Sequence, residues 1–117
     1  MRSLTSHEAE LLEALLKHGQ ASDDSMLTEA TRQDLIAQIP STRVHSECGC
    51  GTCPSIQLSA QRQDASFASM EIIEAGTVSH DAMIMLFVND YQLSYLEVAP
   101  MGDSTVELPA LDQLVFF

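Results

Sequence analysis

Residues 82 to 98, AMIMLFVNDYQLSYLEV, decide the fold of this chain. The first seven residues are apolar in succession, whereas a strand with one wet face alternates apolar and polar residues, so we expect a central strand covered on both faces. Asn89 and Asp90 interrupt the apolar run, and both residue types tolerate positive φ in a tight turn. Residues 91 to 98 then predict the second strand of a β-hairpin.

Three further strands are expected before this hairpin. Residues 42 to 47 and 54 to 59 alternate like half-buried strands, and residues 67 to 75 predict another strand. The chain therefore predicts a mostly antiparallel sheet of about five strands. The helices can cover only one face of it, so we expect residues 108 to 117 or a second copy of the protein to cover the other.

Two helices are expected before the sheet. Thr5 and Glu8 have the spacing of a capping box, and four leucines follow at helical spacing, at positions 11, 12, 15 and 16. Gly19 predicts the C-terminal stop that glycine often provides at the position after the cap. The second helix follows N-cap candidates at residues 23 to 25, and Pro40 ends it. The fold class is thus α+β, in a single domain of residues 1 to 117.

Charge narrows the classes of partner. The 117 residues include 17 acids against 5 bases, with a net charge of −12, and no base follows residue 62. Such a surface repels phosphate, so we expect no nucleic acid and no anionic membrane as a partner, and it suits a basic protein or bound cations. No apolar run approaches the roughly 18 residues that span a bilayer, so a cytoplasmic protein is expected.

All three cysteines lie in residues 44 to 56, VHSECGCGTCPSI. Cys48, Cys50 and Cys53, with His45 upstream, offer four nitrogen or sulfur ligands for zinc, and the intervening glycines let the backbone fold around an ion. Cys50 and Cys53 also form a C-x-x-C pair for thiol redox chemistry, although in redox enzymes that motif usually opens a helix. The third reading is a purely structural turn. The residues by themselves do not decide among the zinc, redox and structural interpretations.

The run IAQIPSTRVHSECGCGTCPSIQL, residues 36 to 58, resembles a group of small uncharacterised bacterial proteins with a C-x-C-G-x-C-P-S motif. The later LFVNDYQLSYLEV and VELPALDQL resemble the closing hairpin and the Leu-Pro tail of the same group. The resemblance implies this order of elements and no assigned activity.

The expected function is a non-enzymatic binding or regulatory module of acidic character, with a zinc site at the cysteine turn as its one candidate cofactor site and no catalytic residues assigned. The alternative is a thiol-dependent redox enzyme or sensor that uses Cys50 and Cys53. The expected partner is a protein, basic in charge, and homodimerisation through residues 82 to 88 or the aromatic end at Phe116 and Phe117 is a further expectation.

Overall fold

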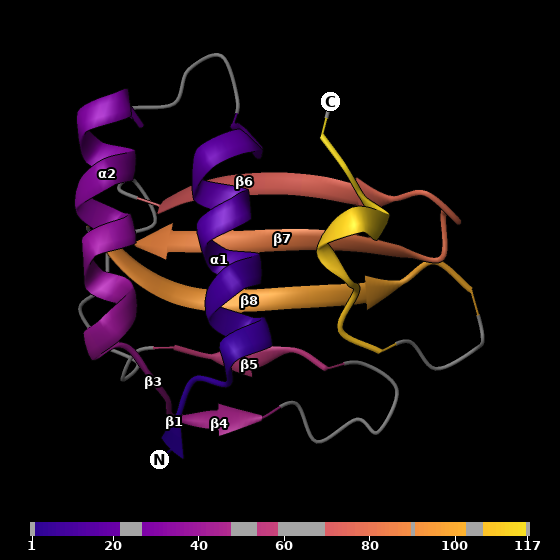
Figure 1. Cartoon of the computed structure of the whole chain (residues 1–117), viewed down its shortest axis with the longest axis horizontal. Coiled ribbons are helices and arrows are strands. Elements are labelled where there is room, and N and C mark those ends of the chain that lie inside the picture. Colours follow the sequence, from indigo (N-terminus) through magenta and orange to yellow (C-terminus); the bar gives the residue numbers. More distant parts are fainter. Residues whose placement is uncertain are drawn as a thin grey trace.

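Helices cover one face of an antiparallel sheet in the computed structural model of the chain (Figure 1). The structure describes residues 2–21, 27–47, 54–58, 70–89, 91–102 and 107–116. Within these ranges the α+β class and the antiparallel pairing predicted from the sequence are confirmed. No helix in the described ranges is long and apolar enough to cross a bilayer.

Helix α1 (Ser6–His18) begins at the predicted capping box. The Thr5 hydroxyl accepts a hydrogen bond from the Glu8 N–H at 3.0 Å, and the Glu8 carboxylate accepts one from the Thr5 N–H at 2.8 Å. The four leucines of its apolar face are fully buried. This helix therefore follows the sequence pattern from its first residue to its last.

Gly19 ends α1 for a different reason from the one expected. Its φ is −63°, so it is extended and does not use the left-handed region that glycine favours. A Cβ at this position would overlap Cγ2 of Ile73 in the sheet and would lie 2.6 Å from the carbonyl oxygen of Leu15. Glycine is required here because the end of the helix lies against the sheet.

Helix α2 (Glu29–Gln38) begins later than predicted. Thr28 is its N-cap, and the Thr28 hydroxyl accepts a hydrogen bond from the Thr31 N–H at 3.2 Å. The N-cap is therefore not one of the predicted candidates at residues 23 to 25, which lie outside the described residues. The helix ends before Pro40, as expected, and a 3-10 turn (Ile39–Ser41) that contains Pro40 follows. Leu35 is the one residue of α2 that is fully buried.

The main sheet has seven strands in the described residues, in the order β2-β6-β7-β8-β5-β4, with β9 beside β6. A separate pair joins β1 to β3. The bounds are β1 (Arg2–Ser3), β2 (Gln20–Ala21), β3 (Arg43–Val44), β4 (Ser46–Glu47), β5 (Ile56–Gln57), β6 (Met70–Thr77), β7 (Ala82–Asn89), β8 (Gln92–Pro100) and β9 (Leu114–Val115).

The prediction of about five strands was therefore too low. The added strands β2 and β9 have two residues each, which is too short for any alternation to show, and they exist because β6 offers them a partner. The predicted strand of residues 42 to 47 divides into β3 and β4, which pair with different neighbours. Pairing with a distant partner decided these elements.

The β7–β8 hairpin is confirmed, with its turn displaced by one residue. Asn89 pairs with Gln92 inside the ladder, so the turn residues are 90 and 91, and the predicted turn at 89 and 90 is wrong by that shift. Tyr91 has a positive φ of 59°, and Asp90 lies outside the described residues. The register also shifts between Phe87 and Val88. A bulge of this kind lets the turn differ from the one that local residues suggest.

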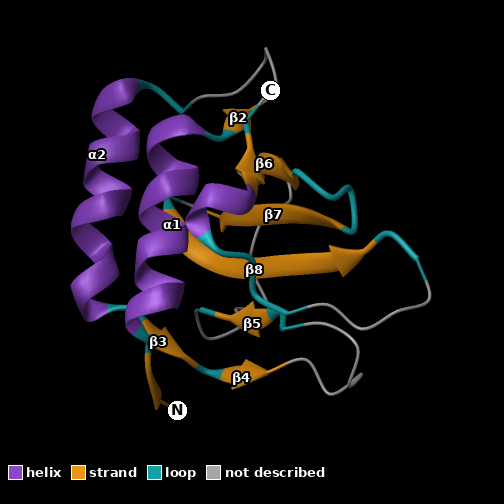
Figure 2. Cartoon of the chain, turned by 45° about the vertical axis from the view of Figure 1, so that its right-hand side comes forward, coloured by secondary structure: helices purple, strands orange, loops and turns teal. Residues whose placement is uncertain are grey.

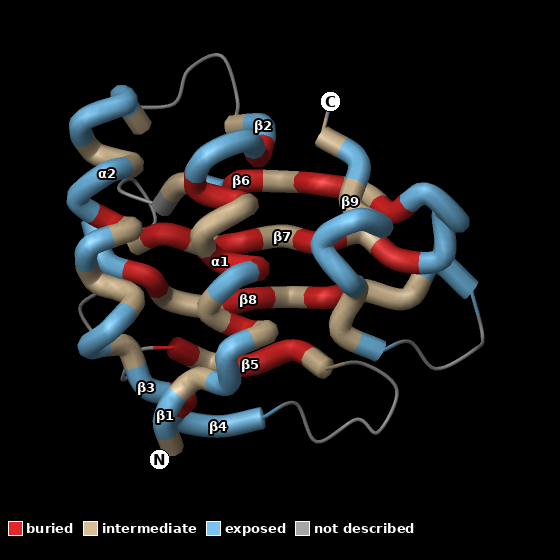
Figure 3. Tube along the Cα trace, in the orientation of Figure 1, coloured by how far each residue is buried: buried red, intermediate tan, exposed pale blue. Residues whose placement is uncertain are grey.

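Alternate residues of β6, β7 and β8 face the helices and form the core (Figure 3). The fully buried members of these strands are Ile73, Ala75, Ile84, Leu86, Val88, Leu96 and Val98. They pack with the leucines of α1 and with Leu35 of α2 in one cluster. All of them lie on the side of the sheet that α1 and α2 cover.

The C-terminal segment lies on this same side (Figure 2). His7 Nε2 lies 2.7 Å from the carbonyl oxygen of Pro109, and the rings of His18 and Phe116 are 5.5 Å apart. Phe116 packs against the core, as expected for an apolar terminus, and Phe117 lies outside the described residues. The expectation that residues 108 to 117 cover the second face of the sheet is wrong for residues 108 to 116, because these contacts hold the segment beside α1.

Candidate functional site

The predicted cysteine turn is bounded by a paired hairpin. Strands β4 and β5 are antiparallel, with Ser46 opposite Gln57 and Glu47 opposite Ile56. This pairing confirms the two flanking strands as neighbours. Cys48, Cys50 and Cys53 lie outside the described residues, so the zinc, redox and structural readings all stay predictions.

His45, the predicted fourth ligand, lies between β3 and β4 with an exposed side chain. Its backbone N–H donates a hydrogen bond of 2.8 Å to the carbonyl oxygen of Gln57, which fixes its main chain beside β5. No cluster of three or more histidine, cysteine or acidic side chains that could hold a metal ion occurs among the residues the structure describes. His45 therefore has no described companion ligand.

Charged and buried groups hold both ends of this hairpin. Arg2 donates hydrogen bonds to Glu47 at 2.9 Å and to Glu8 at 2.8 and 2.9 Å, and so joins β4 to α1. On the other side, the buried hydroxyl of Ser55 accepts a hydrogen bond of 2.9 Å from the Val98 N–H of β8. The entry to the cysteine segment is thus tied to α1 and its exit to β8.

The turn between β6 and β7 carries a further histidine, His80. The Thr77 hydroxyl donates a 2.7 Å hydrogen bond to Asp81, and hydrogen bonds from Thr77 and Ser79 lower the pKa of Asp81 below its ordinary value. His80 itself has a positive φ of 58° and is exposed. These hydrogen bonds hold the turn between β6 and β7, so the role of Asp81 is structural.

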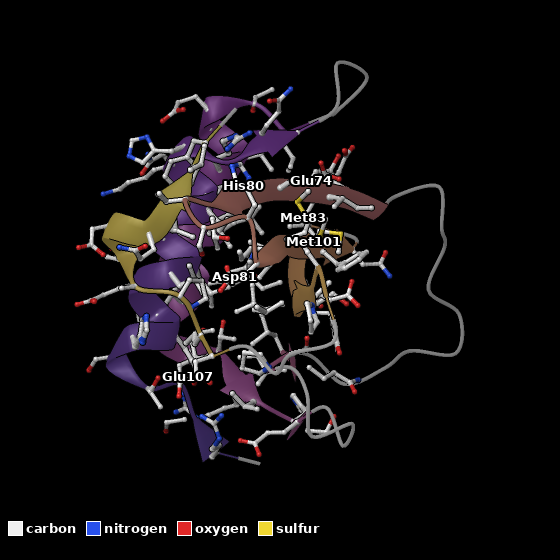
Figure 4. The ribbon with its side chains drawn as sticks, turned by 90° about the vertical axis from the view of Figure 1, so that its right-hand side faces the viewer. Glu74, His80, Asp81, Met83, Met101 and Glu107 are labelled. Carbon is white, nitrogen blue, oxygen red and sulfur yellow. The ribbon has the colours of Figure 1, made fainter. Side chains whose placement is uncertain are left out.

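The side of the sheet away from the helices is the most distinctive surface. We call it the open face and define it as Ile72 and Glu74 of β6, Met83, Met85 and Phe87 of β7, and Tyr95 and Glu97 of β8. These residues alternate with the buried core residues, so they point to the other side of the sheet. Figure 4 shows Glu74 and Met83 on the side opposite α1, α2 and the C-terminal segment. None of those described elements covers it.

The register arranges the open face in rows across the three strands. One row is Ile72, Phe87 and Tyr95, and the rings of Phe87 and Tyr95 meet edge to face with centroids 6.1 Å apart. In the next row Met85 lies between Glu74 and Glu97. The open face is thus an apolar stripe along β7 with one carboxylate on each flank.

No ion pair among the described residues includes Glu74 or Glu97. The described bases are engaged elsewhere: Arg2 with Glu8 and Glu47, Lys17 with Glu13 at 3.1 Å, and two with backbone carbonyl oxygens, Arg32 with that of Leu16 at 2.9 Å and Arg43 with that of Thr42 at 3.1 Å. The last base in the sequence is at position 62, before β6 begins, so β6, β7 and β8 contain none. The open face therefore presents negative charge around an apolar centre.

The sequence predicted the apolar part of the open face but not the pair of carboxylates that flanks it. The apolar run at residues 82 to 88 indicated a strand with two apolar faces and therefore a need for a second cover. Glu74 was not linked to Glu97, because only the strand register places them on either side of Met85. Side chains alternate between the two faces of a strand. A search for acids an even number of positions from the apolar residues that face away from the core would have found both carboxylates.

Comparison with protein families, with curated proteins and with solved structures finds no match for this chain. The resemblance to small bacterial proteins with the cysteine motif accordingly stays a prediction.

Proposed function

We propose that the protein is a non-enzymatic binding module of the cytoplasm, which holds a basic protein partner on the open face. The observation that carries this proposal is the row in which Glu74 and Glu97 flank Met85 on a face that no described helix covers. A partner that buries the stripe gains the free energy of removing apolar area from water. Cationic side chains of the partner, placed at the margins of the stripe, would pair with the Glu74 and Glu97 carboxylates.

The charge of the whole chain supports the same partner class. With a net charge of −12, the protein attracts basic molecules and repels acidic ones over distances of about one Debye length, ~8 Å at physiological salt. Charge of this kind raises association rates and discriminates between partners more than it raises affinity. Binding through the open face should therefore weaken as salt concentration rises.

The test is capture from an extract of cells that express the protein. A double variant, Glu74→Gln with Glu97→Gln, removes two charges from the open face, and Glu10→Gln with Asp34→Asn removes two from exposed helix positions. We expect a basic protein to bind the wild type and the helix variant at low salt and to be lost from the open-face variant. Equal capture by all three proteins would refute the proposal.

The cysteine turn adds a second element to the proposal, a zinc ion held by Cys48, Cys50, Cys53 and His45. The paired strands β4 and β5 support it, because they fix both ends of the segment that carries the thiols. Mass spectrometry of metal in protein purified without a metal column tests this element, together with a count of reactive thiols. One zinc per chain and thiols that react only after chelation are expected; three freely reactive thiols without metal would leave a structural turn.

The redox alternative makes a separate prediction for the same thiols. A catalytic or sensing cysteine needs a pKa below the ordinary value of about 8.5, because the thiolate is the reactive form. Alkylation rates measured against pH report that pKa. If all three thiols titrate near the ordinary value, the redox alternative is excluded.

A further inference from the structure

We infer that the open face binds an amphipathic α-helix of its partner, laid along β7, with basic residues on both margins of the apolar stripe of that helix. This inference rests on the proposed function and specifies the form of the partner. It follows from the dimensions of the open face, from the placement of its two carboxylates and from the absence of bases on the strands that form it.

The width of the surface fits a single helix. Neighbouring strands lie about 4.8 Å apart, so Glu74 and Glu97, on the two strands beside β7, are separated by about 9.6 Å between Cα atoms. An α-helix with its side chains is ~10–12 Å across. A helix seated over Met85 therefore brings its two margins above the two carboxylates.

The length and composition of the stripe fit as well. Met83, Met85 and Phe87 run along β7 over about 13 Å at roughly 3.3 Å per residue, which matches about nine residues of helix. Methionine is unbranched and polarizable, so it adapts to side chains of different shape. Lysine and arginine at the helix margins can lay their aliphatic stems on the apolar stripe and reach the carboxylates with their charged ends.

A second copy of this chain fits the same face less well. Two open faces in contact would place the Glu74 and Glu97 carboxylates of both copies at one interface, with no base from either set of strands to neutralise them. Like charges in a desolvated interface oppose association. The complementary partner is therefore cationic, and amphipathic helices that dock in grooves supply an apolar stripe in the required form.

Three synthetic peptides of identical composition, leucine and lysine in about 14 residues, test the inference. The first places leucines at helical spacing with lysines on both margins, the second alternates leucine and lysine with the period of a strand, and the third is scrambled. Binding to the full chain is measured by NMR titration, which also locates the contact. We expect the first peptide to bind most tightly and to shift the amide signals of β6, β7 and β8.

Variants of the chain make the outcome specific. Glu74→Gln with Glu97→Gln should weaken the helical peptide about three- to tenfold, whereas Glu10→Gln with Asp34→Asn should leave its affinity within about twofold. If all three peptides bind equally and the open-face variant weakens each of them, the inference of a helical partner is overturned and the proposed function stands. Affinity that does not change in the open-face variant would overturn both.

Sedimentation of the free protein tests the remaining candidate for the open face, a second copy of the chain. A monomer at micromolar concentration agrees with an open face that awaits its partner. A dimer that dissociates on Met85→Lys, with the fold kept by circular dichroism, would assign the face to a second copy and overturn the inference.

Discussion

The two faces of the same three strands differ in what lies against them. On one face Ile73, Leu86 and Leu96 are fully buried beneath α1 and α2; on the other Ile72, Phe87 and Tyr95, one residue earlier or later in each strand, are partly exposed. Both faces are largely apolar. The difference shows that apolar character by itself does not place a residue in the core: the helix-facing side is a core because two helices from the N-terminal part of the chain cover it.

The faces also differ in how their charges are matched. Glu8 on the helix side is buried and bound by Arg2, whereas Glu74 and Glu97 on the open face have no cation beside them among the described residues. A buried carboxylate that loses its cation destabilises the fold, whereas a half-buried one with no described cation remains available to a partner. Substitutions that are matched between the two faces can test this contrast.

The largest effect is expected from neighbouring residues of β7 that point in opposite directions. Ile84→Ala leaves a cavity in the core and should lower the free energy of unfolding by about 2–5 kcal/mol. Met85→Ala, on the open face, should cost about 1 kcal/mol or less. Urea denaturation measures both. An equal loss would mean that the open face is covered in the folded protein, contrary to the comparison.

The next effect concerns the close approach of α1 to the sheet. Gly19→Ala forces its Cβ against Ile73 and should cost about 1–3 kcal/mol, because the end of the helix must move. Gly102→Ala is the matched control, since nothing lies within 4 Å of the new Cβ. If thermal unfolding of the two variants is the same, the helix is not held as closely as the structure shows.

A pH effect should separate the paired carboxylate from the unpaired ones. Hydrogen bonds from Arg2 lower the pKa of Glu8 below its ordinary value of 4.5, and they outweigh burial, which raises it. Because the folded pKa is the lower one, the stabilisation is complete above pH 4.5 and is lost as the pH falls through the folded pKa.

Glu8→Gln should therefore cost about 1 kcal/mol near neutral pH and make the acid side of the stability profile shallower. Glu74→Gln removes no described ion pair and should cost less at neutral pH. Urea midpoints at pH 7 and pH 3 provide the measurement, and a steeper acid loss in Glu8→Gln than in the wild type would contradict the assignment.

The smallest effect is expected at the turn that joins β7 and β8. Tyr91 has a φ of 59°, which costs a residue with a bulky side chain about 1 kcal/mol, whereas asparagine adopts this region more readily. Tyr91→Asn should raise the free energy of unfolding by a few tenths of a kcal/mol. It should leave peptide binding at the open face unchanged. A loss of stability would show that the exposed ring makes contacts that outweigh the strain.

The sequence predicted those elements whose signals are local. The capping box at Thr5 and Glu8, the leucine spacing of α1 and the apolar run of β7 each depend on residues within a few positions of one another, and the structure confirms all three. The two-residue strands β2 and β9 and the division of β3 from β4 were missed, because each depends on pairing with a distant partner.

By itself the sequence determined an acidic α+β chain with a strand that is apolar on both sides, since composition and short-range periodicity are written in the order of residues. Only the tertiary structure decided which side of that strand the two helices cover. The C-terminal segment packs beside α1 and pairs with β6, and the register then aligns Glu74, Met85 and Glu97 across three strands. Their alignment is a property of strand pairing, which joins residues that lie far apart in the chain.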